Sequence, residues 1–186
     1  MTNLNKLFLI AYNSLLGNIP SYNITASING ILINMSASYQ PGIITLQGSV
    51  TIQSQSNSLS IQVYFGQYLM DSIDTQVQIS PGTYTVVYTL TIADSTGIIS
   101  NAVGLAVTNQ LKSLSISTNA SSYVISLTQD MLTFYLGYTS YPSTISITVT
   151  FTLTSGSTVT GSYQTSAPAL PQGVSLYGTM IPVTFY

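Results

Sequence analysis

The residues of this chain that could do chemistry are few and far apart. Its 186 residues include only four acidic and two basic side chains, and no His or Cys. General acid–base catalysis, nucleophilic catalysis and most metal sites need His, Cys, Glu or clustered Asp. Asp71 and Asp74 could give two oxygens to a calcium ion, yet the other ligands of a loop site are missing nearby. We therefore expect no enzyme activity, no metal and no cofactor, and interpret both residues as turn formers in a solvated loop.

The charge balance argues against two classes of partner. Charged residues make up 3% of the chain and the net charge is -2, whereas soluble domains carry about 25% charged residues. Two lysines cannot neutralise a nucleic-acid backbone, and an acidic chain gains nothing from an anionic membrane. No apolar run reaches the ~18 residues of a membrane span. We therefore expect no nucleic-acid partner and no membrane insertion of the mature chain.

The same composition indicates an acidic exterior. Stability depends on pH only through groups whose proton affinity changes on folding, and few such groups are present. Stability should therefore change little from neutral pH far into acid. An ordinary mesophilic surface protein rich in Ser and Thr is the alternative interpretation.

Three sequons point to an exported protein. They begin at Asn23, Asn34 and Asn119 and match the N-glycosylation acceptor pattern, although chance matches occur in a chain rich in Asn, Ser and Thr. N-linked glycans at these asparagines would hydrate a nearly uncharged surface. We expect an extracellular, cell-surface protein whose signal peptide was removed before residue 1 of this numbering.

The hydrophobic pattern predicts an all-β fold. Between Ser143 and Thr154, apolar residues alternate with Ser and Thr, which is typical of a half-buried antiparallel strand. Further strands are predicted at Ile43–Gln53, Leu59–Phe65, Gln76–Ile79, Thr83–Ile92, Val103–Thr108, Ser113–Thr118, Tyr123–Thr128, Ser157–Tyr163 and Val174–Tyr186. Residues 166–173 are expected to form a loop between sheets. This spacing favours a β-sandwich, as one head or as two small lobes meeting near Asn109–Lys112.

One of these strands carries a resemblance. Ser80–Asp94, with a Pro-Gly turn followed by Tyr-Thr-Val alternation, resembles the late strand of immunoglobulin-like surface modules. The resemblance implies an immunoglobulin-like antiparallel β-sandwich. We expect this head to span residues 21–186, preceded by a tail over residues 1–20.

The tail is apolar on both alternating faces, so a strand there must be covered. It would pair within its own sandwich, or complete the open sheet of the next subunit by donor-strand complementation. In the second case, the bulkier even-numbered residues Phe8, Ile10 and Tyr12 should enter the neighbouring core. Because such a head-to-tail contact need not close, it would build a filament. The apolar residues of the expected donor strand are Leu4, Leu7, Phe8, Leu9, Ile10, Tyr12, Leu15 and Leu16.

Taken together, the scarce charge, Ser/Thr-rich strands, sequons and apolar tail resemble the subunits of archaeal thread filaments, the glycosylated pili of thermoacidophilic archaea. The resemblance implies a pilin-type head, similar to that of bacterial chaperone-usher pilins, in a head-to-tail homopolymer serving adhesion and biofilm formation. One alternative is a surface-layer protein or a viral coat or fibre protein of an acidophilic host. Another is a carbohydrate-binding module that uses Tyr135, Tyr138 and Tyr141.

Overall fold

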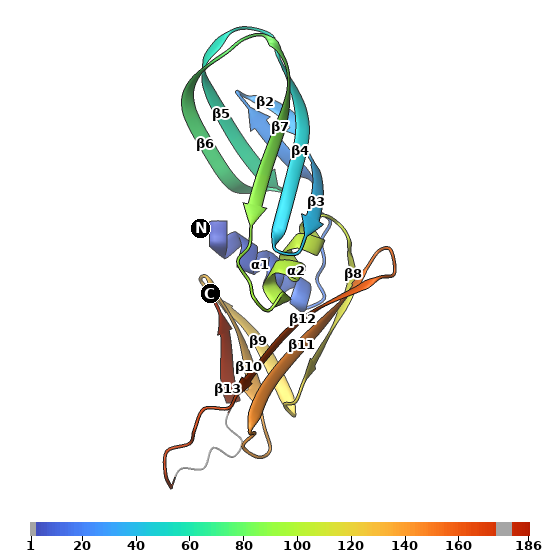
Figure 1. The fold of residues 1–186 in the computed structure, drawn as a ribbon, viewed down its shortest axis with the longest axis vertical. Helices are drawn as coiled ribbons and strands as arrows, with labels where there is room; N and C mark the ends of the chain where they lie inside the picture. Colours follow the sequence, from blue (N-terminus) through green and yellow to red (C-terminus); the bar gives the residue numbers. More distant parts are fainter. Residues whose placement is uncertain (1–2, 174–179) are drawn as a thin grey trace.

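A computed structural model describes residues 3–173 and 180–186. The molecule is elongated, with β-strands at both ends and two helices between them (Figure 1). In chain order the elements are α1 (Asn3–Leu15), β1 (Ile24–Ile28), β2 (Ile31–Asn34), β3 (Ser36–Gln40), β4 (Ile43–Ile52), β5 (Ser56–Phe65), β6 (Tyr68–Ile79), β7 (Gly82–Thr91), α2 (Ile98–Val107), β8 (Leu111–Thr118), β9 (Ser122–Thr128), β10 (Met131–Gly137), β11 (Thr144–Leu153), β12 (Thr158–Ser166) and β13 (Met180–Phe185).

The N-terminal lobe holds strands β1 to β7 in two antiparallel sheets. One sheet has the order β2-β1-β5-β6 and the other has the order β3-β4-β7. Alternate residues of the strands point inward, as the period of two requires. Ile44 and Leu46 of β4 are buried in this way, together with Val63 and Phe65 of β5.

The C-terminal lobe holds strands β8 to β13, also in two antiparallel sheets. Their orders are β12-β11-β8 and β13-β10-β9. In β11, Ile145, Ile147, Val149 and Phe151 are all buried and the Ser and Thr residues between them are not. The alternation predicted for residues 143–154 is therefore confirmed.

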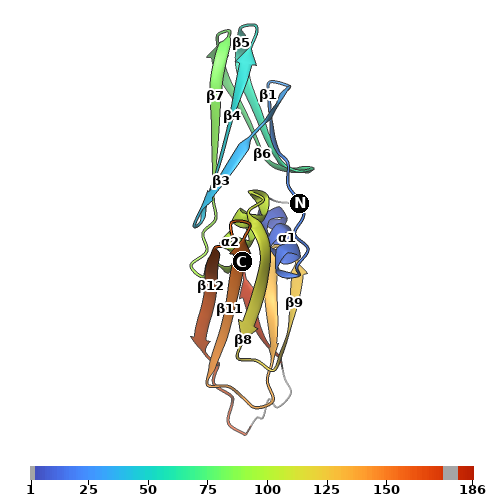
Figure 2. The same cartoon turned by 90° about the vertical axis from the view of Figure 1, so that its right-hand side faces the viewer.

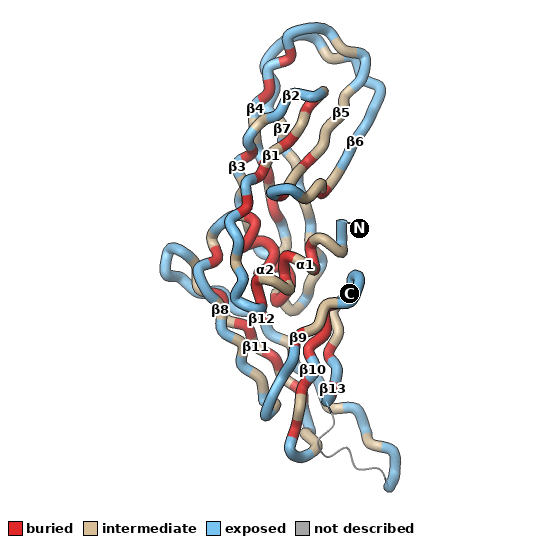
Figure 3. The backbone as a smooth tube through the Cα atoms, turned by 180° about the vertical axis from the view of Figure 1, so that it is seen from behind, coloured by how far each residue is buried: buried red, intermediate tan, exposed pale blue. Residues whose placement is uncertain are grey.

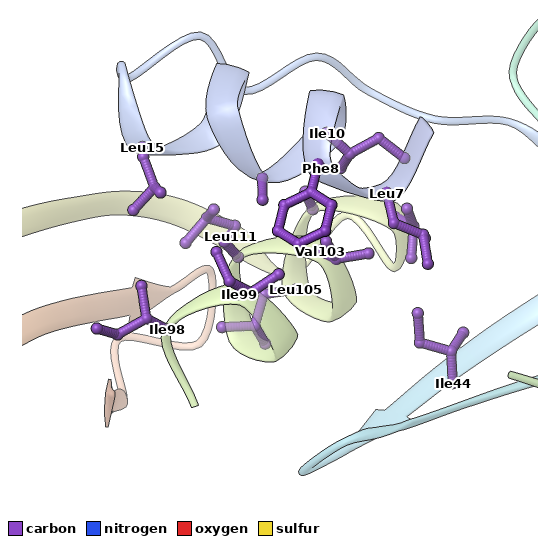
Figure 4. Close-up of a cluster of buried hydrophobic side chains, with 14 of the residues drawn as sticks. Leu7, Phe8, Ile10, Leu15, Ile44, Ile98, Ile99, Val103, Leu105 and Leu111 are labelled. Carbon is purple, nitrogen blue, oxygen red and sulfur yellow. The ribbon is translucent and has the colours of Figure 1, made fainter. Parts of the chain in front are cut away.

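Between the lobes, α1 and α2 pack on each other (Figure 2). All ten residues of α2 are buried, and only Ser100 and Asn101 among them are polar, as expected for a helix that is enclosed on every side. The strand predicted over Val103–Thr108 is wrong for this reason, because a helix without a polar face shows no helical period. Figure 4 shows Phe8 of α1 directed toward Val103 of α2.

The predicted N-terminal strand is also wrong, because Asn3–Leu15 forms α1. Its buried residues Leu7, Phe8, Ile10, Ala11 and Leu15 follow the three- and four-residue spacing of a helix and include both parities. Because the segment is a helix, it has no alternating strand faces. The prediction that Phe8, Ile10 and Tyr12 enter a neighbouring core as one strand face is therefore wrong. Of the other residues of the expected donor strand, Leu9 and Tyr12 are half-buried, whereas Leu4 and Leu16 are exposed.

A glycine stop ends α1. Gly17 has a φ of 82°, a left-handed conformation that glycine adopts at low cost. Its N–H donates to the Ser14 carbonyl at 2.9 Å, and the Asn18 N–H donates to the Asn13 carbonyl at 2.9 Å. This pair of bonds satisfies two of the carbonyls left open at the end of the helix.

Several other boundaries differ from the predicted ones. β6 begins at Tyr68, well before the predicted start at Gln76, and the short strands β1 to β3 and β10 were not predicted. The loop expected at residues 166–173 agrees with the coil that follows Ser166. Of the strand predicted over residues 174–186, Met180–Phe185 forms β13, and residues 174–179 lie outside the described part of the chain.

Candidate functional site

The far end of the N-terminal lobe, at the turn between β6 and β7, is hollowed between its two sheets. An apolar groove of about 450 Å³ lies there between the two sheets, and we name it the tip groove. No charged residue lines it. Six of its lining residues are Ile28, Val50, Ile61, Val77, Ile79 and Val86.

The tip groove exists because β6 and β7 are edge strands of different sheets. Ile73 lies opposite Ile61 and therefore shares its inward face, yet 41% of its surface is exposed. Val77, four residues further along β6 on the same face, is 42% exposed. Figure 3 shows β6 as a largely exposed strand. The inward side chains at this end of the lobe thus lack a complete cover.

Asp71 and Tyr88 bridge β6 and β7. The Tyr88 hydroxyl donates to the Asp71 carboxylate at 3.1 Å. Burial, together with the hydrogen bond and negative charge of Asp71, raises the pKa of Tyr88 to about 12. A phenol that stays protonated in this way is a structural donor, not a general base near neutral pH.

The calcium alternative finds no support in this geometry. Asp71 and Asp74 lie within strand β6, not in a loop, so their interpretation as turn residues is also wrong. Asp71 pairs with Val63 and Asp74 pairs with Ser60. Residues three apart in a strand point to opposite faces, so the two carboxylates diverge. The described residues contain no group of three or more acidic, His or Cys side chains that could hold a metal.

A second cavity of about 680 Å³ lies beside α2 and is lined by residues of both lobes. Asp94 reaches into the turn that begins α2, and its carboxylate accepts hydrogen bonds from the N–H groups of Thr96 at 3.0 Å, Ile99 at 2.8 Å and Ser100 at 2.9 Å. The N–H groups of Ile99 and Ser100 are backbone donors that the first helical turn leaves unsatisfied. The carboxylate of Asp94 is therefore occupied in capping the helix.

Tyr39 joins the N-terminal lobe to α2 at the same cavity. Its hydroxyl donates to the Asn101 side-chain oxygen at 2.8 Å and accepts from the Gly42 N–H at 3.3 Å. Burial is the main cause that raises the pKa of Tyr39. The ring lies against Gly104, where an added Cβ would come within 2.2 Å of it. The polar groups described here serve to hold the lobe to the helix.

Asn109, whose role was not predicted from the sequence, connects the segment after α2 to the segment before β1. It has a φ of 56° just after α2, and its side-chain amide exchanges hydrogen bonds of 2.9 and 2.8 Å with the backbone of Tyr22. Asn tolerates the left-handed conformation that ends helices. Asn109 was not recognised as a residue that follows a helix, because residues 103–108 were predicted to form a strand.

The three sequon asparagines Asn23, Asn34 and Asn119 are all exposed. Asn119 lies between β8 and β9, and its amide nitrogen donates to the Thr144 carbonyl at 2.7 Å while its oxygen accepts from the Tyr138 hydroxyl at 2.8 Å. N-glycosylation at these positions stays a prediction.

The tyrosines considered for sugar binding form no shared stacking surface. Tyr135 points outward from β10, but Tyr138 is buried and bonded to Asn119. The Tyr141 hydroxyl donates to the Pro168 carbonyl.

The fold thus defines a mostly β protein with antiparallel sheets and two short helices, whose described polar clusters support the fold. Among the described residues, no helix combines the length and apolar character needed to cross a membrane. The chain is 62% identical over 185 residues to "Uncharacterized protein 61" of the Sulfolobus islandicus filamentous virus (isolate Iceland/Hveragerdi), and the match covers 100% of this chain and 99% of that protein. The chain belongs to the family of that viral protein.

This relationship corrects the resemblance to archaeal thread subunits. A relative over the full length comes from a filamentous virus, not from a cellular pilus. The interpretation as a pilin that polymerises by donor-strand exchange for adhesion and biofilm formation is therefore wrong. No family model and no solved structure matches the chain.

Proposed function

We propose that this chain is a non-enzymatic structural protein of a filamentous virus with an acidophilic host, acting as a coat or fibre component. The observation that supports this most is the full-length relationship to a protein of a filamentous virus. An elongated β-rich molecule is also a suitable building element for the outside of a particle (Figure 1).

The uncharged surface supports an exposed position in hot acid. On the sheet β12-β11-β8, the inward residues of β11 are apolar and the outward face consists of hydroxyl and amide side chains. The outward pairs between β11 and β8 are Thr148 with Ser117, Thr150 with Ser115, and Thr152 with Ser113. Such a face stays hydrated without ionisable groups, so its properties do not change as carboxylates become protonated.

Other features extend the proposal. Each lobe is an immunoglobulin-like β-sandwich, and the protein acts outside the host cell with N-glycans on its exposed asparagines. Its partners are proteins and glycans, because two lysines offer little to a phosphate backbone.

The proposal is tested by quantitative mass spectrometry of virions purified on two successive density gradients. We expect the chain to remain with the particles at a constant ratio to their main coat protein. Loss of the chain at the second gradient, with abundant chain left in the infected-cell extract, would contradict a structural role. Detection of glycan mass on peptides containing Asn23 or Asn34 tests the glycosylation separately.

A further inference from the structure

We propose that two copies of this chain associate through strand β7, in a two-fold symmetric antiparallel pairing centred on Val87. This pairing joins the sheets β3-β4-β7 of both copies into one continuous six-stranded sheet. It goes beyond the proposed function and does not depend on it, because a pair could form in solution whether or not the chain enters a particle.

β7 has an open and unprotected edge. It runs for ten residues, Gly82–Thr91, and pairs only with β4 among the described strands. Its register with β4 is regular, and it contains no charged residue and no proline. A long, regular and uncharged edge strand offers free backbone groups to another strand.

The other edges of the described sheets are less available. β6 carries Asp71 and Asp74 and has irregular pairing with β5. β13 contains Pro182, which cannot donate to a ladder. The remaining edges are short or covered: β2 and β3 have four and five residues, β8 has an irregular pairing near its start, β9 contacts α1, and the Ser162 N–H of β12 donates to the Thr96 carbonyl at 2.9 Å.

β7 is also complementary to a second copy of itself. In an antiparallel pair, residues that lie opposite each other point to the same face of the sheet. A two-fold axis that relates two identical strands must therefore lie midway between the two copies of one residue, which is then its own partner. With the axis at Val87, Val87 meets its own copy. The other opposite pairs are Thr85 with Thr89, Thr83 with Thr91, Val86 with Tyr88, and Tyr84 with Leu90.

These pairs are of kinds that stabilise sheets. Thr–Thr and aromatic–aliphatic pairs across strands are favourable, and no like charges meet. Val87 points outward and is 59% exposed, so the pair removes an apolar surface from water at its centre. A neutral strand is best matched by a neutral partner, and the chain itself supplies one, since charged residues make up only 3% of it.

The tip groove lies beside β7. A second β7 would add a strand about 4.8 Å beyond the first, on the side where β6 and β7 diverge. Its inward residues Val86 and Leu90, which lie opposite Tyr88 and Tyr84 of the first copy, would then approach the exposed inward side chains Ile73 and Val77 of the first copy. The pairing therefore covers apolar groups that the single chain leaves partly open.

The pairing is tested first by sedimentation equilibrium of the full chain. We expect a mass of twice 19.8 kDa. Val87→Lys places two ammonium groups on the two-fold axis and should weaken association about tenfold or more. The matched control is Val124→Lys, because Val124 is an equally exposed valine (56%) on the edge strand β9. Its association should equal that of the unchanged chain.

Crosslinking tests the register. The chain has no cysteine, so Val87→Cys introduces a single thiol, and opposite Cα atoms at about 4.5–5.5 Å suit a disulfide. We expect covalent dimers from Val87→Cys alone, and from a mixture of Thr85→Cys with Thr89→Cys chains. Thr89→Cys alone should crosslink poorly, because two copies of residue 89 lie four residues, or about 13 Å, apart.

A single-chain mass at every soluble concentration would overturn the proposal. So would association that Val124→Lys abolishes and Val87→Lys leaves intact, or crosslinking of Thr89→Cys with itself as fast as Val87→Cys. Circular dichroism of each variant confirms that it is folded. Absence of the chain from purified virions would contradict the proposed function without affecting this pairing.

Discussion

The contribution of Phe8 to stability tests whether the N-terminal segment is a helix packed within its own chain. Phe8 is 2% exposed and lies in the contact between α1 and α2 (Figure 4). Truncating a buried phenylalanine costs about 3–5 kcal/mol, because transfer energy is lost and a cavity remains. Phe8→Ala should therefore remove a large part of the ~5–15 kcal/mol that stabilises a typical domain.

The neighbouring residues sharpen this test. Leu7 and Ile10 are buried, so alanine there should cost about 2–5 kcal/mol, whereas the half-buried Leu9 should cost clearly less. Urea unfolding followed by circular dichroism measures each difference, with a constant slope as the check of two-state behaviour. A strand would instead group Phe8 with Ile10, and Leu7 with Leu9. Loss of stability that follows this parity, or no loss for Phe8→Ala, would refute the helical packing.

Three further perturbations probe the region around α2 and the tyrosines. Asp94→Ala removes the cap of α2 and should lower the free energy of unfolding, measured by urea titration, by about 1–2 kcal/mol. Asp94→Asn should lower it less, and two variants as stable as each other would contradict the capping role. Gly104→Ala places a Cβ 2.2 Å from the Tyr39 ring and should cost about 1–3 kcal/mol, and an unchanged thermal midpoint would show that the contact is looser. Burial raises the pKa of both Tyr22 and Tyr88 from 10.0 to about 12, so the stability linked to their protonation is complete below pH 10 and is lost as the pH rises toward 12. Tyr88→Phe should reduce that alkaline loss in urea midpoints measured from pH 9 to 12, and an unchanged pH profile would count against the raised pKa.

The strands that could be predicted are those with one buried and one hydrated face. Residues 143–154 alternate cleanly because β11 is the central strand of a sheet with a polar outer side. The alternation can be recognised in the sequence without knowing which strands lie beside β11. β6 was predicted only at its end, since its inward residues include Asp71, which is kept there by the hydroxyl of Tyr88.

The helices were missed for two different physical reasons. α2 is buried on every side, so its sequence has no polar face from which a period could be measured. In α1, Leu7, Phe8, Ala11 and Leu15 do follow a helical spacing, but the additional apolar residues around them also fit two strand faces. Gly17, at the C-terminal end of α1, was the stop signal that favoured a helix.

The candidate surfaces depend on non-local pairing, which the sequence does not reveal. The Pro-Gly turn before β7 predicted a strand there, and β7 begins at Gly82. That this strand has only one neighbour, and that β6 lies in the other sheet, follows from the order of the strands. The exposed positions of Asn23 and Asn34 likewise follow from their places at the ends of β1 and β2.

The proposed structural role is tested most directly by immunogold electron microscopy of intact virions with antibodies raised against this chain. We expect gold particles on the surface of the filaments, or at their ends if the chain is a fibre component. Label confined to infected cells, with bare particles that react normally with antibodies against their main coat protein, would contradict it.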